Sequence, residues 1–315
     1  MKSALVTGAS GVLGPRLVRA LLNDGWSVRT LTRNKPGPGL WSEGVDVRLG
    51  DVTIADQVAA AMDGVATVFH LAGLLHNPRP AAREVARYEA VNVVGARNVA
   101  RAAGAMGVSV VAFSTIAVYG ATEGPVDETT EARPVGLYAE TKRRAEEALL
   151  ETGQGACVLR LAAVYGRRMK GNYHTLVQAL RRGLFVPIGS GSNRRTLVHE
   201  DDLMRAAILA AFRRPIGILN VTDGRTYTLN EIVEAICMAL DRPKPAYTLP
   251  ESAARLAARL IGRRDTVEKY LENVEVRGDL IQKTLGFVPA FDLLSGWRDA
   301  IRATEQHVRP GQEGR

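Results

Sequence analysis

The residues that most clearly suggest chemistry are Tyr138 and Lys142, in the stretch LYAETK. In a helix, residues four apart share one face and lie about one turn from each other. A free tyrosine has a pKa of about 10, so it is a poor base at neutral pH. A lysine ammonium at ~5 Å would stabilise the phenolate by roughly 3 kcal/mol at an effective dielectric of about 20, or about two pKa units. In a dinucleotide-binding fold, the spacing therefore predicts that Tyr138 takes or gives a proton near neutral pH.

Two hydroxyl side chains, Ser114 and Thr115, stand at the end of an apolar run in VSVVAFSTIAVYG. At the end of a buried strand, such hydroxyls either support the following turn or face a ligand. We interpret Ser114 as support for the turn. The next two residues, Ile116 and Ala117, are apolar and can neither donate nor accept a proton. A site at this position would therefore lack a further acid or base beside the hydroxyls.

A glycine-rich turn near the start of the chain, SALVTGASGVLGPRLVRALL, predicts a phosphate cradle. Its spacing is G-x-x-G-x-x-G, between an apolar run and a segment of helical spacing. The first glycine would permit a tight turn, the second would admit a pyrophosphate, and the third would let helix and strand pack closely. The helix N-terminus would then offer free N–H groups to the phosphates. The expected cofactor contacts of this turn are Gly8, Ser10, Gly11, Val12, Leu13 and Gly14.

The residues that follow the second apolar run, SVRTLT, indicate which nicotinamide cofactor is preferred. NAD-binding folds usually place a carboxylate about 20 residues beyond the glycines, where it holds the ribose 2′-hydroxyl. From Gly25 to Ser42 this chain has no Asp or Glu, and the run ends in Thr32 and Arg33. A guanidinium there suits a 2′-phosphate. We therefore expect Thr32 and Arg33 at the cofactor and a preference for NADP over NAD, with a solvated strand-end charge as the alternative for Arg33.

The residues at the ends of two further apolar runs, GDVT and HLAG, are expected to lie beside the cofactor. GDVT would place Asp51 at the adenine edge, with Val52 supplying a backbone N–H. HLAG would end beside the pyrophosphate, and its histidine, His70, is expected to be structural because its neighbours are apolar. The expected cofactor contacts at these two ends are Asp51, Val52, Leu71, Ala72 and Gly73.

Short apolar runs alternate with helical patterns over the first half of the chain. The runs are SALVTG, SVRTLT, VDVRLG, TVFHLAG, VSVVAFS and ACVLRLA, and the helical patterns cover 12–23, 54–62, 84–106 and 138–151. This alternation predicts an α/β fold, a doubly wound parallel sheet of Rossmann type with helices on both faces. The candidate residues above would then lie at the carboxyl ends of its strands.

After about residue 166 the alternation weakens and most segments predict helices. We expect residues 1–166 with about 200–240 to form the dinucleotide-binding domain. About 167–199 with 241–304 should form a smaller, mostly helical C-terminal lobe that binds substrate, and 305–315 a frayed tail. The run IGILNV should return to the main sheet, and the proline-rich LDRPKPAYTLPE should be a linker.

Composition narrows the class of protein. The 315 residues are 46% hydrophobic and 23% charged, which is ordinary for a globular protein. No apolar run approaches the ~20 residues of a membrane span or predicts a signal peptide, so we expect a cytoplasmic protein without a membrane partner. Cys157 and Cys237 lie in apolar runs, which predicts reduced thiols and no metal site. The net charge of +8 is dispersed, which favours phosphate-bearing small molecules over nucleic acid.

Together these stretches resemble the extended short-chain dehydrogenase/reductase family, in its nucleotide-sugar epimerase/dehydratase branch. The resemblance runs from Lys2 to about residue 303. The stretches that support it are TGASGVLG, GDVT, HLAG, VNVVGARNVARAA, FSTIAVYG, YAETK, LRLAAVYG and RRTLVHEDDL. The resemblance implies an NAD(P)-dependent enzyme acting on a nucleotide-diphosphate sugar, and a homodimer formed through 84–106 and 138–151.

The resemblance also implies roles for individual residues. Thr115 would hydrogen-bond the reacting sugar oxygen, Tyr138 would be the acid/base, and Lys142 would also hold the nicotinamide ribose. Asn92 matches a family asparagine that supports the fold or the cofactor. On the substrate side the matching residues are Asn172, Tyr173 and Arg195, with Arg194 as the alternative to Arg195 and with Arg263, Arg264 and Arg277 as candidates for a second phosphate contact.

Small differences separate the branches of this family. Its 4,6-dehydratases have Asp-Glu directly after the catalytic threonine, where this chain has Ile116 and Ala117. The resemblance therefore favours hydride transfer at C4 without dehydration, either by a 4-ketoreductase, which we favour, or by a UDP-hexose 4-epimerase with tightly bound NAD. A ketone reductase for a hydrophobic substrate is disfavoured by the arginine-rich C-terminal lobe. A non-catalytic NAD(P)-sensing protein is disfavoured by the presence of Tyr138 and Lys142.

Overall fold

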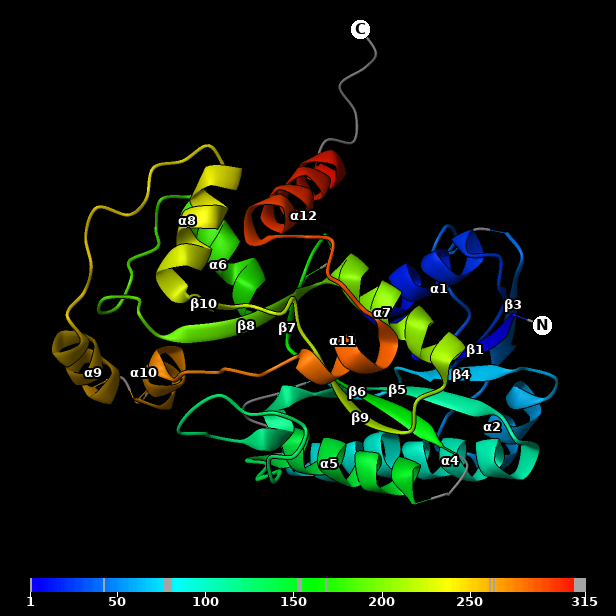
Figure 1. Cartoon of the computed structure of the whole chain (residues 1–315). Helices are drawn as coiled ribbons and strands as arrows, with labels where there is room; N and C mark the ends of the chain where they lie inside the picture. The colour runs from blue at the N-terminus through cyan, green and yellow to red at the C-terminus, as the bar shows by residue number, and fades with distance from the viewer. Residues whose placement is uncertain are drawn as a thin grey trace, which may run out of the picture.

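The computed structural model describes residues 2–308 apart from 42, 76–80, 152–154, 168, 261 and 263. At its centre is a seven-stranded sheet in the order β3-β2-β1-β4-β5-β6-β9, and every neighbouring pair is parallel (Figure 1). The strands are β1 Ser3–Thr7, β2 Ser27–Thr32, β3 Val45–Leu49, β4 Thr67–His70, β5 Ser109–Thr115, β6 Ala156–Leu161 and β9 Gly217–Val221. The doubly wound parallel sheet predicted from the sequence is confirmed, including the return of IGILNV as β9.

Helices cover both faces of this sheet, as Figure 1 shows. One face is covered by α1 Gly14–Asn23, α7 Glu200–Arg213 and α11 Asp279–Leu285. The other is covered by α2 Ala55–Met62, α4 Gly95–Met106 and α5 Leu137–Leu150, with α3 Ala82–Tyr88 and the π-helix η1 Glu89–Val94 leading into α4. All six residues of β6 are buried because both faces are covered, and this explains why its sequence is mostly apolar, whereas the edge strand β3 is largely exposed and contains charged residues.

A second, three-stranded sheet lies beside the first, in the order β10-β8-β7. Its strands are β7 Ala163–Tyr165, β8 Arg194–His199 and β10 Thr226–Thr228. They pack with α6 Asn172–Arg181, α8 Leu229–Ala239 and α12 Leu293–Val308 around a third core, in which the rings of Tyr165 and Trp297 stack 4.5 Å apart. α9 Glu251–Leu260 and α10 Arg264–Leu271 lie at the far end of this outer lobe, on the left in Figure 1.

The outer lobe differs from the sequence-based expectation in several places. It is mostly helical, as expected, but it also contains a sheet, of which the outer strands β7 and β10 have three residues each and are too short to show periodicity. α8, which we expected in the main domain, packs in the third core. α12 continues to Val308, so residues 305–308 of the expected tail are helical, and 309–315 lie outside the described residues. The boundaries of the two domains stay a prediction.

None of the helices that the structure describes combines the length and the apolar character needed to cross a bilayer. The longest, α12, has 16 residues and includes several charged side chains.

Candidate active site

The glycine turn, the end of β4 and one face of α5 enclose a pocket of about 510 Å³. It lies at the carboxyl edge of the main sheet, where the strand order reverses between β1 and β4. Open α/β sheets bind their ligands at this position. Among the residues that line the pocket are the expected ones Gly8, Ser10, Gly11, Val12, Leu13, Gly14, Leu71, Gly73, Tyr138 and Lys142. The structure thus brings the phosphate cradle and the tyrosine–lysine pair into one cavity.

The turn from β1 into α1 has a shape that fits a pyrophosphate. Gly8 has a φ of +70°, and a Cβ there would lie 2.6 Å from the backbone nitrogen of Ala72. A Cβ at Gly14 would overlap the backbone of Ala9. α1 begins without a side-chain cap and without an acidic residue in its first turn, so its first N–H groups are available to an anion. The turn therefore fits a nicotinamide dinucleotide.

Tyr138 and Lys142 lie one turn apart on α5, at the end of β5. The Nζ of Lys142 donates a hydrogen bond of 2.6 Å to the carbonyl oxygen of Phe113. The hydroxyl of Tyr138 is hydrogen-bonded to the side chain of Thr115. The Thr115 hydroxyl oxygen also accepts the backbone N–H of Ala117 at 3.2 Å, which caps the 3₁₀ helix η2 Ile116–Tyr119. The three residues that the resemblance implies as catalytic therefore meet at one strand end.

Burial shifts the pKa values of both members of this pair. Burial raises the pKa of Tyr138, and the hydrogen bond from Thr115 only partly opposes it. Burial lowers the pKa of Lys142 to about 8, and the negative charge of Glu146 opposes that shift. Both shifts have the same physical cause, because removal from water disfavours the phenolate and the ammonium alike. That Lys142 brings the Tyr138 pKa towards neutrality during the reaction stays a prediction.

A buried ion pair that the sequence analysis missed lies beneath the site. Glu146, one turn beyond Lys142 on α5, is 1% exposed and accepts a hydrogen bond of 2.5 Å from the hydroxyl of Ser114. Arg160 of β6 donates three hydrogen bonds of 2.7 to 3.2 Å to the same carboxylate. The spacing could have revealed it, because Tyr138, Lys142 and Glu146 follow one another at intervals of four on one helix face.

Asn92 lies on the π-helical turn η1, a type of helix often found at functional sites. Its side-chain nitrogen donates a hydrogen bond of 3.0 Å to the Thr141 hydroxyl, and its side-chain oxygen accepts the backbone N–H of Leu74 at 2.8 Å. Leu74 lines the pocket, and Thr141 is on α5. Asn92 therefore connects the loop after β4 to the helix of Tyr138. A direct contact of Asn92 with the cofactor stays a prediction.

The expected adenine and ribose contacts lie outside the pocket lining, at the ends of β2 and β3. Arg33 is exposed after β2, and Thr32 is buried. Asp51 follows β3, where its carboxylate accepts the backbone N–H of Thr53 at 2.9 Å, and Val52 is buried. β2 is the direct neighbour of β1, so a ligand extending from the glycine turn along this edge would reach these residues. Their roles as cofactor contacts stay predictions.

The expected substrate residues lie away from the pocket lining. Asn172 is exposed at the start of α6, and burial raises the pKa of its neighbour Tyr173 to about 12. The guanidinium of Arg195 donates hydrogen bonds to the carbonyl oxygens of Tyr270 and Glu272, so it closes the end of α10. The alternative, Arg194, is exposed and pairs with Glu275 at 3.3 Å, and Arg263 lies outside the described residues.

One cation on the substrate side was not singled out in the sequence. Lys170 lines the pocket together with the glycine turn and Tyr138. It stands in the arginine-rich loop between β7 and α6, where no motif distinguishes it from its neighbours. An exposed ammonium at the pocket is suited to a phosphate-bearing substrate.

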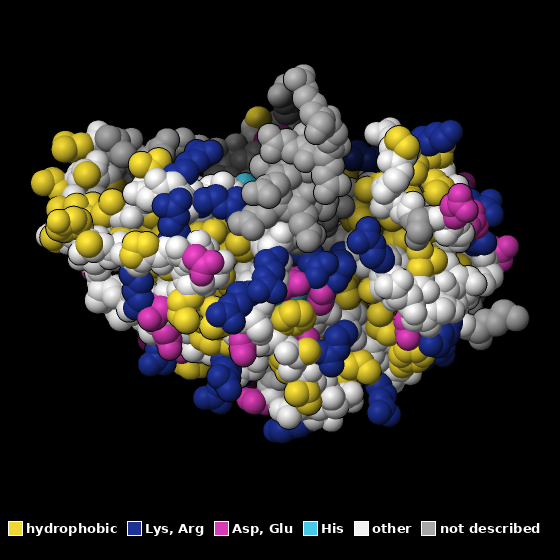
Figure 2. Space-filling view, turned by 90° about the horizontal axis from the view of Figure 1, so that it is seen from above, with side chains coloured by type: hydrophobic (Ala, Val, Ile, Leu, Met, Phe, Trp, Pro, Cys, Tyr) yellow, Lys and Arg dark blue, Asp and Glu magenta, His cyan; other side chains and the backbone are white. Residues whose placement is uncertain are grey.

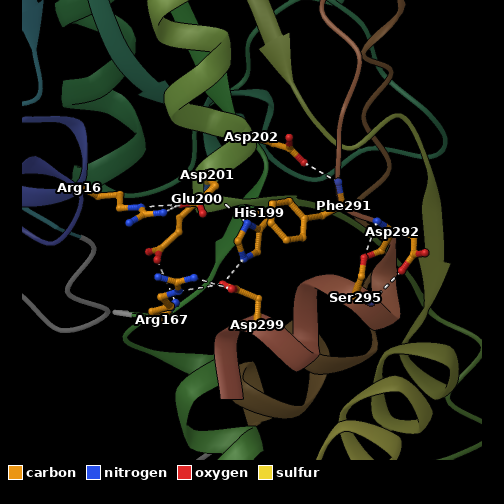
Figure 3. Close-up of polar contacts among 10 residues, drawn as sticks. All are labelled: Arg16, Arg167, His199, Glu200, Asp201, Asp202, Phe291, Asp292, Ser295 and Asp299. Carbon is orange, nitrogen blue, oxygen red and sulfur yellow. Dashed lines mark hydrogen bonds and ion pairs between the residues drawn. The ribbon is translucent and has the colours of Figure 1, made fainter. Parts of the chain in front are cut away.

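A second polar cluster connects α1, β8, α7 and α12 (Figure 3). Arg16 of α1 donates a hydrogen bond of 2.5 Å to Asp201, and Arg167 donates two, of 2.6 and 2.9 Å, to Asp299. The possible ligand atoms of His199, Asp201 and Asp299 lie within 4.8 Å of one another. The two guanidiniums already neutralise these carboxylates, so the arrangement does not favour a cation. The cluster links the helix of the glycine turn to the outer lobe.

Comparison with known proteins defines the class of this protein. The family model described as the NAD dependent epimerase/dehydratase family matches residues 4–221, which include the main sheet, the glycine turn and the tyrosine–lysine pair. The chain therefore belongs to the NAD-dependent epimerase/dehydratase family. The family resemblance recognised from the motifs is confirmed.

The relatives of this chain include an epimerase and a reductase by name. The chain is 27% identical over 318 residues to the UDP-glucose 4-epimerase of Vibrio cholerae, covering 96% of this chain and 95% of that protein. It is 32% identical over 265 residues to the ceramide reductase of Caulobacter vibrioides, covering 81% of this chain and 76% of that protein. The structure of MoeE5 in complex with UDP-glucuronic acid and NAD is similar with a TM-score of 0.77 and 28% identity, over 97% and 99% of the two chains.

Proposed function

We propose that this protein transfers a hydride between a nicotinamide cofactor and C4 of a nucleotide-activated sugar, as a 4-ketoreductase. The observation that supports it is the meeting of Tyr138 and Lys142 with the glycine turn in one pocket. Its relatives include a UDP-glucose 4-epimerase and a protein solved with a UDP-sugar and NAD, which supports a nucleotide sugar as substrate. A UDP-hexose 4-epimerase with tightly bound NAD is the alternative within the same chemistry.

The residues of the chain supply positioning and proton transfer. When bound, the nicotinamide supplies or accepts the hydride. The Tyr138 hydroxyl, oriented by Thr115, gives its proton to the sugar carbonyl oxygen during reduction and takes it back during oxidation. Lys142, fixed by the Phe113 carbonyl, stabilises the phenolate that remains, and the nearby carboxylate of Glu146 keeps the ammonium protonated.

Dehydration is excluded from this proposal on the side chains beside Thr115. Ile116 and Ala117 begin η2, and neither can protonate a leaving hydroxyl or remove a carbon-bound proton. A 4,6-elimination needs both functions. The activity expected at this site is therefore restricted to hydride transfer with proton transfer to the same C4 oxygen.

For the cofactor we propose NADP in preference to NAD. The sequence from Gly25 to Ser42 contains no carboxylate, and Arg33 is exposed at the end of β2, where a 2′-phosphate would lie. Titration of the purified protein with NADPH and NADH tests this, and equal or tighter binding of NADH would contradict it. A stoichiometric NAD that copurifies and does not exchange would favour the epimerase over the reductase.

A second candidate function is favoured by one comparison. The 32% identity to a ceramide reductase supports a ketone reductase for an apolar substrate, and the pocket also includes Leu74, Leu75, Phe113 and Leu161. Against it stands the excess of arginine in the outer lobe, which favours a phosphate-bearing ligand. The two substrates are chemically distinct, so activity on one class tests the choice directly.

The deciding experiment is a turnover screen with NADPH and NADH. It uses 4-keto sugars and hexoses linked to UDP, dTDP and GDP, and long-chain 3-keto lipids as the apolar class. We expect reduction of at least one nucleotide-linked 4-keto sugar, and none by Tyr138→Phe. Unchanged turnover by Tyr138→Phe would contradict the mechanism, and turnover of keto lipids alone would favour the second candidate. Cofactor binding with no turnover would favour the non-catalytic sensing protein.

We propose that the assembly is a homodimer formed through α4 and α5. These helices pack against each other on one face of the main sheet, and the resemblance to the family implies that this pair forms the interface. The small residues of GARNVARAAGA lie in α4 and mostly pack inside the protomer. Light scattering after size exclusion measures the mass of the particle in solution. A monomer at micromolar concentration would contradict this assembly.

A further inference from the structure

Helix α9, at the far end of the outer lobe, has two opposite apolar sides. Its buried residues are Ala254 and Ala258, which lie one turn apart against the lobe. Leu256 and Leu260 stand two positions after these alanines, about half a turn round a helix of 3.6 residues per turn. They are 61% and 81% exposed. The leucines of α9 therefore face away from the protein.

The chain beside α9 adds further exposed apolar side chains. Leu184 and Val186 follow α6, and Tyr247 and Leu249 precede α9, and all four are exposed. The two segments are held side by side by hydrogen bonds from the N–H of Leu249 to the Pro187 carbonyl (2.8 Å) and from the N–H of Gly189 to the Leu249 carbonyl (2.9 Å). Figure 2 shows hydrophobic side chains gathered on the left, at the end of the molecule where Figure 1 places α9. The name α9 surface denotes Leu184, Val186, Tyr247, Leu249, Leu256 and Leu260.

The net positive charge of the chain lies in the same lobe. Segments 167–199 and 241–300 contain 17 Lys and Arg against 9 Asp and Glu, whereas the rest of the chain contains 24 of each. These segments have a net charge of +8, and with the two glutamates of α8 the lobe still has a net charge of +6. Exposed arginines close in sequence to the α9 surface are Arg182, Arg242 and Arg259. Arg255 of α9 is also exposed, but it pairs with Glu251 and Glu268 at 3.8 and 3.4 Å. A second copy of this chain would bring two such positive lobes together, so charge disfavours self-association through this surface.

We propose that the α9 surface docks on an anionic phospholipid membrane. Leucine and tyrosine side chains flanked by arginines match both parts of such a membrane, the boundary between headgroups and acyl chains and the negative charge above it. Leu256, Leu260 and Tyr247 enter the boundary, and Arg242 and Arg259 contact the phosphates. Docking of this kind needs no spanning helix. The expectation of no membrane partner rested on spanning length, a criterion that does not test a surface contact.

Co-sedimentation of the full chain with vesicles tests the proposal. One set contains phosphatidylcholine with phosphatidylglycerol, and the other contains phosphatidylcholine alone. We expect binding to the first set, weakened by added salt, and much weaker binding to the second. The double variant Leu256→Ser/Leu260→Ser should bind anionic vesicles at least about tenfold more weakly, and Arg242→Gln/Arg259→Gln about tenfold more weakly. Equal binding to the two vesicle sets would overturn the assignment to an anionic surface.

A matched control distinguishes binding through the α9 surface from non-specific binding through any exposed apolar side chain. Ile216 and Val288 are 76% and 58% exposed and do not belong to the α9 surface. The variant Ile216→Ser/Val288→Ser should therefore bind vesicles like the unmodified protein. An equal loss of binding in this control would overturn the proposal. So would wild-type binding by Leu256→Ser/Leu260→Ser with an unchanged melting temperature. A smaller particle mass for that variant in vesicle-free solution would show a subunit interface instead, and would also overturn it.

Discussion

The main-sheet region and the outer lobe differ in where their charged side chains lie. Around the main sheet acidic and basic residues are nearly equal in number, and the charges nearest the site are buried and paired, as in Glu146 and Arg160. In the outer lobe basic residues are in excess and exposed, beside leucines that are also exposed. A buried ion pair fixes the geometry of the site and shifts the pKa values of its neighbours. An excess of exposed basic side chains attracts anionic ligands or surfaces from the solvent. We interpret the first region as the place of the chemistry and the second as the place of contact.

The largest effect expected from this comparison is on turnover. Tyr138→Phe removes the proton donor of the buried site and should lower kcat by about 10²–10⁴-fold, with little change in cofactor affinity. Tyr247→Phe removes the same hydroxyl from the exposed outer lobe and should leave kcat unchanged. Steady-state kinetics on the substrate found in the screen, with cofactor titration by fluorescence, provide both measurements. A comparable loss of kcat in the two variants would contradict the proposal that catalysis takes place at the buried site and not in the outer lobe.

The next largest effect concerns the buried carboxylate under the site. Glu146→Gln leaves Arg160 without its counter-charge and should lower the free energy of unfolding by about 3 kcal/mol. Because the Glu146 charge raises the pKa of Lys142, its removal should lower that pKa further below about 8. If charged Lys142 is needed, the alkaline limb of the activity profile moves to lower pH by about one unit.

The neighbouring residue provides the control for this prediction. Glu147 is exposed, pairs with Arg143 at 3.3 Å, and differs from Glu146 mainly in burial. Glu147→Gln should change neither the urea midpoint nor the pH profile. Loss of stability in Glu146→Gln with an unmoved alkaline limb would show that Glu146 acts on the fold alone.

The main sheet could be predicted from the sequence because the same short pattern, an apolar strand followed by a helix, recurs along the chain. Strands buried on both faces need mostly apolar residues, as in ACVLRL of β6, where only Arg160 is charged, and a parallel sheet needs a helix between successive strands. The glycine turn was predictable for a similar reason, since Gly8 and Gly14 stand where a Cβ would meet backbone atoms. Each of these patterns can be read from a short stretch of sequence, although the backbone that Gly8 approaches is that of Ala72, far along the chain.

The remainder could not be predicted because it depends on contacts between distant segments. The partners of Glu146 are 32 and 14 residues away, on two different strands. Arg195 matched a family arginine by sequence, yet its guanidinium contacts backbone carbonyls about 75 residues further along. The raised pKa of Tyr138 follows from burial, which no spacing between Tyr138 and Lys142 reveals. Short strands such as β7 and β10 carry too few residues for a pattern.

A smaller effect is expected on cofactor choice. Arg33→Gln should weaken NADPH binding about tenfold and leave NADH binding unchanged, because only NADPH has the 2′-phosphate that the guanidinium would contact. Arg259→Gln, which removes the same charge from the outer lobe, should change neither affinity. Isothermal titration with both cofactors measures the difference. Parallel weakening of NADPH by both substitutions would mean that Arg33 acts only through the general positive field.

The smallest effect is on stability, at Asp223, where the chain leaves β9 for the outer lobe. Burial raises the pKa of Asp223 from 3.8 to about 6, although its carboxylate accepts the backbone N–H of Arg225 at 3.1 Å. The native state therefore holds this proton more tightly than the unfolded chain, so its contribution to stability falls as pH rises from about 4 to about 6 and stays low above that.

Asp223→Asn keeps an oxygen for the Arg225 N–H and removes the buried charge. It should raise the free energy of unfolding by about 1 kcal/mol at pH 8 and change it little at pH 4, as measured by urea denaturation at both values. Asp241→Asn, an exposed substitution in the same lobe, should leave the difference between the two pH values as it is in the unmodified protein. If Asp223→Asn altered stability equally at pH 4 and pH 8, the cause would be packing, and this acid would not titrate between the two.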